Sequence, residues 1–284
     1  MLSYRHAFHV GNHADVLKHM VLLQVLNHAT QKDKPFWYID THAGAGSYAL
    51  DKGYAVQNAE FSGGIGRLWD ARELPQPLTD YVGLIRRCNR DQELRFYPGS
   101  PVLAFHAIRP DDRLRLFELH PSDHKLLLQA FGRLSASSRQ VMIMAEDGFA
   151  GIKGLLPPPP RRAVVLIDPP YEEKKDYQRV VDMLRDSLRR FATGTYIVWY
   201  PILQRPEPQQ MLQKLKKLSL KNWLHVGLTV RSPTADGFGM HGSGLFIVNP
   251  PWTLPALLNE TMPVLTEYLA VDQGAGYQLE SHIS

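Results

Sequence analysis

The stretch Asp168-Pro169-Pro170-Tyr171 brings an acid, a rigid kink and an aromatic ring together. It follows residues 163–167, an apolar and β-branched run of strand length. Such a run is typical of a strand buried on both faces of a parallel sheet. The two prolines cannot continue the hydrogen-bond ladder, so the strand must end there. We therefore expect these groups at the carboxyl end of a central strand, where open α/β sheets bind ligands.

Methylation of an exocyclic amine on adenine would use each of these groups. The amine nitrogen is a weak nucleophile because its lone pair is delocalised into the ring. Asp168 and the carbonyl of Pro169 can accept its two hydrogens, orient it and stabilise the positive charge that develops. Tyr171 can stack on the base, a contact worth about 1–3 kcal/mol, and the base must be unpaired or flipped to be reached. The competing interpretation is a proline-terminated strand whose aspartate caps the next helix.

Other strand ends offer groups for a methyl donor. The small residues of the turn 41–46 (THAGAG) let the backbone bend sharply and approach a ligand. The turn lacks the third glycine of a dinucleotide fingerprint, which disfavours a nicotinamide cofactor. Glu118 is placed to accept hydrogens from a ribose, and Asp147-Gly148 to bind the adenine end of the donor. An exposed strand-end glutamate and a turn aspartate are the alternatives.

A second stretch, Asn249-Pro250-Pro251-Trp252, repeats the pattern of polar residue, prolines and aromatic ring. We expect it to lie away from the site, within an antiparallel pair at the sheet edge and far from the glycine turn, with Trp252 in core or rim packing.

The histidines offer little support for a metal site. His9 and His13 are four residues apart, but no carboxylate or cysteine cluster accompanies them, so no metal is expected. His19 and His42 are better placed as donors toward a cofactor carboxylate or ribose.

The elements that must position these groups alternate along most of the chain. Residues 48–95 break the rhythm and predict a helical insertion, because the next strand comes too late for a strand–helix–strand unit of ~30 residues. The remaining pattern predicts one α/β domain over 1–284, with an open, mostly parallel sheet and an antiparallel edge pair. The seven expected strands are 36–40, 113–118, 140–144, 163–167, 195–200, 223–231 and 244–248. The expected helices around them are 14–30, 100–108, 122–131, 177–191 and 208–218.

Composition sets the class of protein. The chain has 284 residues, 44% of them hydrophobic, which is ample for a sizeable core. Cys88 is the one cysteine, so neither an intramolecular disulfide nor a multi-cysteine zinc site can form. The net charge of +4 suits a polyanionic partner without demanding one. We expect a cytoplasmic protein, since no apolar run reaches membrane-spanning length and the N-terminus lacks the apolar core of a signal peptide.

Longer motifs make the chain resemble a known family. Asp-Pro-Pro-Tyr with the upstream turn resembles the class I adenine-N6 methyltransferases that use S-adenosylmethionine. The chain is more specifically similar to the RlmJ-type 23S ribosomal RNA adenine-N6 methyltransferases of Gram-negative bacteria. The segments that carry this similarity are 2–19 (LSYRHAFHVGNHADVLKH), 97–101 (YPGSP), 118–123 (ELHPSD) and 189–196 (RRFATGTY). The similarity covers nearly the whole chain and fades in the insertion and after about Asp272.

The resemblance implies a Rossmann-like methyltransferase sheet of seven strands with a small helical insertion. It also implies that S-adenosylmethionine methylates N6 of one adenine in 23S rRNA, adenine 2030, and leaves as S-adenosylhomocysteine without a metal. Carried onto this sequence, the donor pocket comprises His19, His42, Ser100, Glu118, Asp147, Gly148 and Asp168. Tyr4, His6 and Lys18 lie on the substrate side.

The expected partner is 23S rRNA, either protein-free or in an early assembly intermediate, and the protein is expected to act as a monomer away from membranes. Two rival functions remain open: a DNA adenine-N6 methyltransferase, disfavoured because no separate target-recognition domain is evident, and a non-catalytic RNA-binding protein on a methyltransferase fold.

Overall fold

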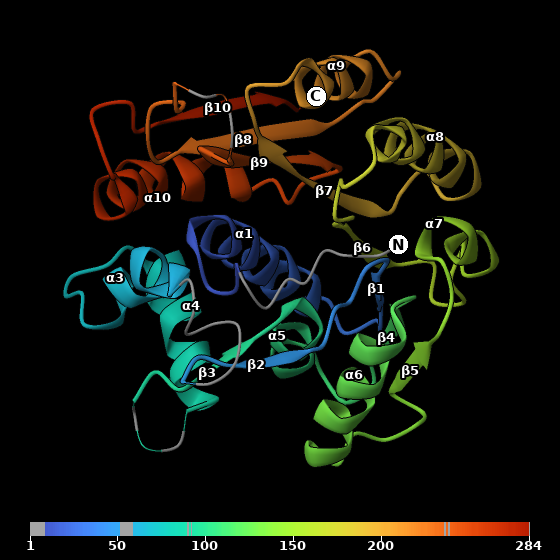
Figure 1. The fold of residues 1–284 in the computed structure, drawn as a ribbon. Helices are drawn as coiled ribbons and strands as arrows, with labels where there is room; N and C mark the ends of the chain where they lie inside the picture. Colours follow the sequence, from blue (N-terminus) through green and yellow to red (C-terminus); the bar gives the residue numbers. More distant parts are fainter. Residues whose placement is uncertain are drawn as a thin grey trace.

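The architecture was obtained from a computed structural model, in which residues 9–51, 59–89, 91, 93–235, 237 and 239–283 are described. Within these residues, eight strands form the main sheet in the order β10-β8-β9-β7-β6-β1-β4-β5 (Figure 1). Five strands run parallel: β1 (Trp37–Asp40), β4 (Arg113–Phe117), β5 (Val141–Met144), β6 (Ala163–Ile167) and β7 (Thr195–Ile202). Three antiparallel strands extend the sheet beyond β7: β8 (Trp223–Thr229), β9 (Gly242–Val248) and β10 (Gly276–His282).

The predicted fold class is therefore confirmed, with one strand more than expected. The added strand β10 pairs with β8 and forms the edge of the sheet. Its sequence, GYQLESH, is mostly exposed and lacks an apolar run, as is common for an edge strand. The predicted edge pair is wrong in one detail, because β9 lies between β7 and β8 rather than at the edge.

Helices cover both faces of the sheet. On one face lie α1 (His13–Thr30), α5 (Ser100–Ala107) and α10 (Leu254–Leu269), while α8 (Lys174–Arg190) and α9 (Pro206–Lys216) cover the other (Figure 1). The sequence did not predict α10, which carries Pro263 inside it. No helix in the described part of the chain is long and apolar enough to cross a bilayer.

Helix α1 is the most deeply buried of these elements. Every residue from Ala14 to Leu26 is buried, and the helix packs against β6, β7, β9 and α5. The side chain of Asn12 caps its first turn by accepting hydrogen bonds from the backbone N–H groups of Ala14 and Asp15. Polar side chains on this helix are thus carried into the interior.

A helical insertion was predicted for residues 48–95. The two ends of this segment are joined by a short antiparallel ribbon of β2 (Ser47–Ala49) and β3 (Phe96–Pro98). Between the two strands lie η2 (Glu60–Gly63), α3 (Ile65–Trp69) and α4 (Gln76–Arg87), of which α3 and α4 contact α10, and α4 also contacts α1. The remaining helical elements are the helix α6 (Pro121–Arg133) and the short turns α7 (Gly148–Gly151) and η3 (Ile152–Gly154).

The order of the parallel strands reverses between β1 and β6. The chain moves outward from β1 to β4 and β5, then returns to β6 and continues to β7 on the other side. Asp40, the last residue of β1, is paired with Leu166 of β6, and the N–H of Thr41 donates to Leu166 O at 3.1 Å. Ligands of open α/β sheets bind at such a reversal, beyond the carboxyl ends of the strands.

Candidate active site

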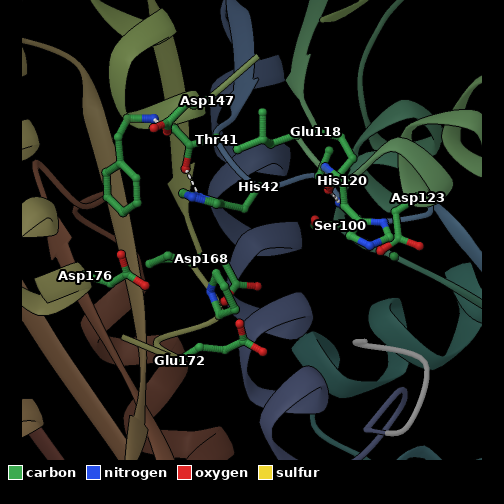
Figure 2. A pocket seen from close by; sticks show the side chains of 18 of the residues that line it. Thr41, His42, Ser100, Glu118, His120, Asp123, Asp147, Asp168, Glu172 and Asp176 are labelled. Carbon is green, nitrogen blue, oxygen red and sulfur yellow. Dashed lines mark hydrogen bonds between the residues drawn. The ribbon is translucent and has the colours of Figure 1, made fainter. Parts of the chain in front are cut away.

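A cavity of about 330 Å³ opens at this reversal (Figure 2). Its wall comes from α1, α5, α8 and the loops that follow β1, β4, β5 and β6. The wall brings together most of the residues singled out in the sequence: Lys18, His19, His42, Ser100, Glu118, Asp147, Gly148, Asp168 and Pro169. Tyr4 and His6 lie outside the described residues, so their substrate-side roles stay predictions.

The glycine turn and Glu118 hold each other in place. Gly44 and Gly46 have φ of +64° and +81°, a conformation that side chains disfavour. The N–H of Gly44 donates to Glu118 Oε2 at 2.8 Å, and the N–H of His120 donates to Oε1 at 2.7 Å. Burial raises the pKa of Glu118 although both N–H groups oppose the shift. Each oxygen keeps a further lone pair, so Glu118 can accept hydrogens from a ribose.

His42 is held by a hydrogen bond to the Thr41 hydroxyl. Its Nδ1 lies 2.8 Å from Thr41 Oγ1, which is also 3.1 Å from Leu166 O (Figure 2). Burial lowers the pKa of His42 to about 3, so the ring is neutral. Its contact with the cofactor stays a prediction. The ring also meets Phe149 edge-on, with centroids 4.8 Å apart.

Asp147 and Gly148 shape the far wall. Asp147 caps α7 by accepting from the Phe149 N–H at 2.9 Å, and its other oxygen pairs with the guanidinium of Arg179. A Cβ on Gly148 would lie 1.9 Å from Thr41 O, so only glycine lets the β5 loop approach the β1 loop this closely. Both oxygens of Asp147 therefore already have hydrogen-bond partners within the protein, and a ligand would share these oxygens with Phe149 and Arg179.

A buried carboxylate that the sequence did not predict as a site residue stands behind Ser100. Asp40 Oδ2 accepts from the hydroxyls of Ser100 and Tyr38, each at 2.7 Å, and Oδ1 accepts from the His42 N–H at 3.2 Å. Burial raises the pKa of Asp40 to about 6 despite these donors. Because the Ser100 proton points to Asp40, its hydroxyl offers only lone pairs to the cavity.

The floor of the cavity is an ion cluster built from α1 and the end of β6. Lys18 Nζ lies 2.7 Å from Asp168 Oδ2 and 2.9 Å from Asp15 Oδ1. Asp15 Oδ2 accepts from the Gly11 N–H at 2.9 Å. Burial lowers the pKa of Lys18, but the two carboxylates outweigh burial and raise it above its ordinary value. The cluster therefore holds one positive and two negative charges, and the excess negative charge can fall on Asp168. The i,i+3 spacing of Asp15 and Lys18 was the available sequence signal for this pair.

Tyr171 does not line the cavity, which disagrees with its predicted stacking role. Its backbone has φ of +52°, and its ring is buried against that of Tyr177 at 4.5 Å between centroids. Its hydroxyl donates to Trp199 O at 2.7 Å. In this arrangement Tyr171 anchors the proline turn to β7 and thereby holds Pro169 and Asp168 in position.

His19 ends a chain of buried hydroxyls that the sequence did not reveal. Tyr81 Oη and Tyr97 Oη lie 2.8 Å apart, and Tyr97 Oη lies 2.8 Å from His19 Nδ1. All three side chains are buried. These hydrogen bonds lead from Tyr81 on α4 through Tyr97 on β3 to His19 in the cavity wall. The segment from β2 to β3 therefore supports the site directly.

The second proline stretch lies at the opposite end of the strands, where the parallel strands begin. Val248 at the end of β9 pairs with Tyr196 near the start of β7, and Asn249 Nδ2 donates to the carbonyls of Ala192 and Gly194. Its separation from the glycine turn follows from the antiparallel direction of β9. Trp252 is 76% exposed, so of the two expected placements, core or rim, the core is wrong. In the part of the chain that is described, no group of three or more His, Cys, Asp or Glu side chains is arranged to hold a metal.

The family model and the most similar named proteins carry matching descriptions. A family described as "Ribosomal RNA large subunit methyltransferase D, RlmJ" matches residues 33–281. Proteins named "Ribosomal RNA large subunit methyltransferase J" are 44% identical over 277 residues in Haemophilus influenzae and 44% identical over 283 residues in Escherichia coli. These alignments cover 97% and 100% of this chain and 96% and 99% of the relatives. A crystal structure of a Legionella pneumophila protein superposes with a TM-score of 0.87 at 35% identity, covering 96% of this chain and 98% of the other.

Proposed function

The chain belongs to the RlmJ family of ribosomal RNA large subunit methyltransferases, and from that premise we propose that it methylates N6 of one adenine in 23S rRNA with S-adenosylmethionine. The observation that carries the proposal is the position of Asp168. Its carboxylate stands beside Pro169 in the wall of a cavity at the strand reversal, where it can accept hydrogens from an exocyclic amine.

The cavity fits the methyl donor in position and charge. Acidic side chains outnumber basic ones in its wall: Glu118, Asp123, Glu146, Asp147, Asp168, Glu172, Glu173 and Asp176 against Lys18, Lys175 and Arg179 (Figure 2). A cationic ligand is attracted to such a surface. Glu118 would hold its ribose, and Asp147 with the N–H groups around Gly148 its adenine. When bound, S-adenosylmethionine supplies an electrophilic methyl group on a sulfonium centre.

The chain's own residues prepare the amine. Asp168 and the Pro169 carbonyl accept its two hydrogens and direct its lone pair into the cavity. As positive charge develops on the nitrogen, the Asp168 carboxylate stabilises it. Asp15 counterbalances Lys18, so the ammonium does not cancel the charge that Asp168 needs.

The same acidic wall supports a flipped base as the substrate group. Phosphates of an RNA backbone are repelled from it, whereas a neutral base is not. The chain as a whole is basic, with a net charge of +4, so the backbone is expected to contact the outer surface. Tyr4 and His6 would meet the substrate at the mouth. We assign adenine 2030 as the target by resemblance to the family.

Asp168→Ala is the direct test. We expect methylation of 23S rRNA to be lost while much of the donor affinity and the fold remain, measured by transfer of a tritiated methyl group and by calorimetry. Mass mapping of RNA from cells lacking the protein should show one adenine without its N6 methyl group. Full activity of the variant would contradict the assignment. Tyr4→Ala should reduce RNA turnover far more than donor affinity.

The rival functions are separated by the substrate used. Methyl transfer to DNA but not to RNA would favour a DNA adenine methyltransferase, and absence of S-adenosylmethionine binding would favour a non-catalytic RNA-binding protein. We further propose that the protein acts in the cytoplasm as a monomer, on RNA that is protein-free or in an early assembly intermediate. Comparing naked 23S rRNA with isolated assembly particles as substrates would test the last point.

A further inference from the structure

Glycines interrupt the antiparallel strands beyond β7 on one face of the sheet. Gly227 lies on β8, Gly242 and Gly244 lie on β9, and Gly276 lies on β10. Residues directly opposite each other in a sheet face the same side. The register places the glycines in two neighbouring rows, Tyr200–Gly244–Gly227–Gln278 and Ile202–Gly242–Thr229–Gly276. Glycine weakens a strand, and its presence there often marks the close approach of another group.

Packing within the protein explains the two glycines of β9. A Cβ on Gly242 would lie 2.3 Å from Leu228 O on the neighbouring strand. A Cβ on Gly244 would lie 2.5 Å from Tyr200 Oη, because the Tyr200 ring lies across this position. Neither site can hold a side chain without a shift of its neighbours.

The glycines of β8 and β10 have no such neighbour among the described residues. A Cβ on Gly227 would come no closer than 3.7 Å to another group, Ile202 Cδ1, and one on Gly276 no closer than 3.8 Å, to Thr229 Oγ1. These are ordinary van der Waals distances, and neither glycine has a positive φ. The fold therefore has room for side chains at both positions, and the two glycines leave the sheet backbone bare.

A second cavity, of about 260 Å³, is lined by both bare positions. The start of α9 and the end of β7 contribute to its wall. Arg205, Gln209 and Gln278 line it with exposed side chains. No hydrogen bond or ion pair engages these three side chains within the described part of the chain. One cation and two amides are therefore available to a ligand that rests on the bare backbone.

The second cavity adjoins the active-site cavity along the starts of α8 and α9, which lie side by side (Figure 1). Lys174 Nζ on α8 lies 2.6 Å from Glu207 Oε1 on α9. Lys175, next to Lys174, lines the active-site cavity, and Arg205, two residues before Glu207, lines the second cavity. An RNA strand that leaves the active site across this ion pair therefore reaches the second cavity.

The two cavities differ in charge. Carboxylates predominate in the active-site wall, whereas the described residues that line the second cavity include no carboxylate and one cation, Arg205. A phosphate is repelled from the first cavity and attracted to the second. A guanidinium can bind two phosphate oxygens at once, and amide side chains can pair with the edges of bases. The second cavity thus suits a nucleotide, with the bare backbone leaving room for its planar base.

We propose that the second cavity binds a nucleotide of the RNA that flanks the target adenosine. Its base lies against the sheet at Gly227 and Gly276, its edge contacts Gln209 and Gln278, and Arg205 holds its phosphate. This inference rests on the proposed function and adds to it a site for a second nucleotide. Two anchored nucleotides fix the direction in which the RNA crosses the protein, which the target base alone does not.

Filling the second cavity is the direct test. Gly276→Val adds a side chain where the fold has room, and valine suits a strand. We expect a 23S rRNA fragment to bind roughly 5-fold or more weakly, the low end of the cost of losing one stacked base, while donor affinity measured by calorimetry is unchanged. RNA affinity is measured by fluorescence anisotropy, so it does not depend on catalysis.

Ser281→Val is a matched control for Gly276→Val. Ser281 is exposed on the same strand but on the other face of the sheet, opposite Leu224. This variant should bind the RNA as the wild type does. Unchanged RNA affinity in a Gly276→Val protein that unfolds at the wild-type temperature would overturn the inference.

Substrates that lack single bases test the inference on the wild-type protein. Each RNA fragment would carry one abasic nucleotide at a successive position on either side of the target. We expect one position at which the loss weakens binding to the wild type by roughly 5-fold or more but has little further effect on Gly276→Val. Uniform affinity along the series would overturn the inference even if the variant fails to fold. A loss of the same size in both proteins at every sensitive position would overturn it as well.

Arg205→Gln tests the phosphate contact. Losing one phosphate contact on a single strand should lower the slope of log affinity against log salt concentration by about 0.7. Arg139→Gln removes the same charge from an exposed position before β5, at the other end of the parallel strands, and should keep the wild-type slope. An unchanged slope in Arg205→Gln would overturn the inference. Failure of the wild type to methylate N6 of the fragment would count against the proposed function, whereas these outcomes are read from binding alone.

Discussion

Asp15→Asn isolates the charge balance at the floor of the cavity. Asparagine has nearly the size of aspartate, and Asp15 does not line the cavity. The substitution removes one negative charge that now lies 2.9 Å from Lys18 Nζ. Lys18 then has Asp168 as its one carboxylate partner in the cluster, and its charge offsets the charge that should stabilise the methylated amine.

The contacts of 2.9 and 2.7 Å on either side of the ammonium set the scale. They place Asp15 roughly 5 Å from Asp168 and roughly 7 Å from an amine that donates to Asp168, at which distance a unit charge contributes about 2.4 kcal/mol at an effective dielectric constant of 20. If about half a charge has developed on the amine in the transition state, the loss is about 1.2 kcal/mol. That corresponds to a rate on the order of 10-fold lower.

The assay is single-turnover methylation of a 23S rRNA fragment, with donor affinity measured separately by calorimetry. We expect the rate to fall about 10-fold while the donor dissociation constant changes little. Asp182→Asn is a matched control, because Asp182 and Arg185 form an i,i+3 pair on α8 that is exposed, and its rate should equal that of the wild type. An unchanged rate in a folded Asp15→Asn protein would refute the reasoning, as would a loss confined to donor affinity.

Three other predictions follow from the described contacts. Tyr171→Phe should lower the free energy of unfolding by about 1 kcal/mol, because it removes the hydrogen bond to Trp199 O; an unchanged stability in urea would argue for a stacking role instead. Asp40→Asn should gain stability relative to the wild type as pH rises. Because the folded pKa of Asp40 is raised to about 6, its favourable contribution is present below its unfolded pKa and is lost as pH rises through about 6. The difference between variant and wild type should shift by about 1.4 kcal/mol from pH 5 to pH 7.5, and a constant difference across this range would contradict the assigned burial. Gly148→Ala should be strongly destabilising, since the new Cβ would lie 1.9 Å from Thr41 O; a wild-type melting temperature would show that the two loops can separate.

Strand ends were the part of the site that sequence reasoning could predict. Buried strands are apolar runs, and the polar residues after them must collect at one edge of a parallel sheet. Glu118, Asp147 and Asp168 were identified in this way and meet in one cavity. The strand β10 gave no such signal, because an edge strand needs few apolar residues.

The orientation of the side chains in the site could not be predicted from the sequence. The position of the His42 ring depends on Thr41, whose hydroxyl contacts a carbonyl 125 residues away. The direction of Tyr171 depends on a backbone conformation with φ of +52°, which its sequence neighbours do not specify. The pairing of Lys18 with Asp168 joins residues 150 positions apart. Each of these features is decided by tertiary contacts rather than by local pattern.

The burial of α1 has a consequence for biosynthesis. The helix that carries Lys18 is translated before β7 and β9, which end at Ile202 and Val248, yet it packs against both strands. The α1 surface that faces these two strands therefore stays uncovered after α4 and α5 are available, and contacts of such long sequence separation form slowly. We therefore expect a nascent chain that ends before β9 to lack a fully packed α1, and to lack the cavity wall that this helix provides.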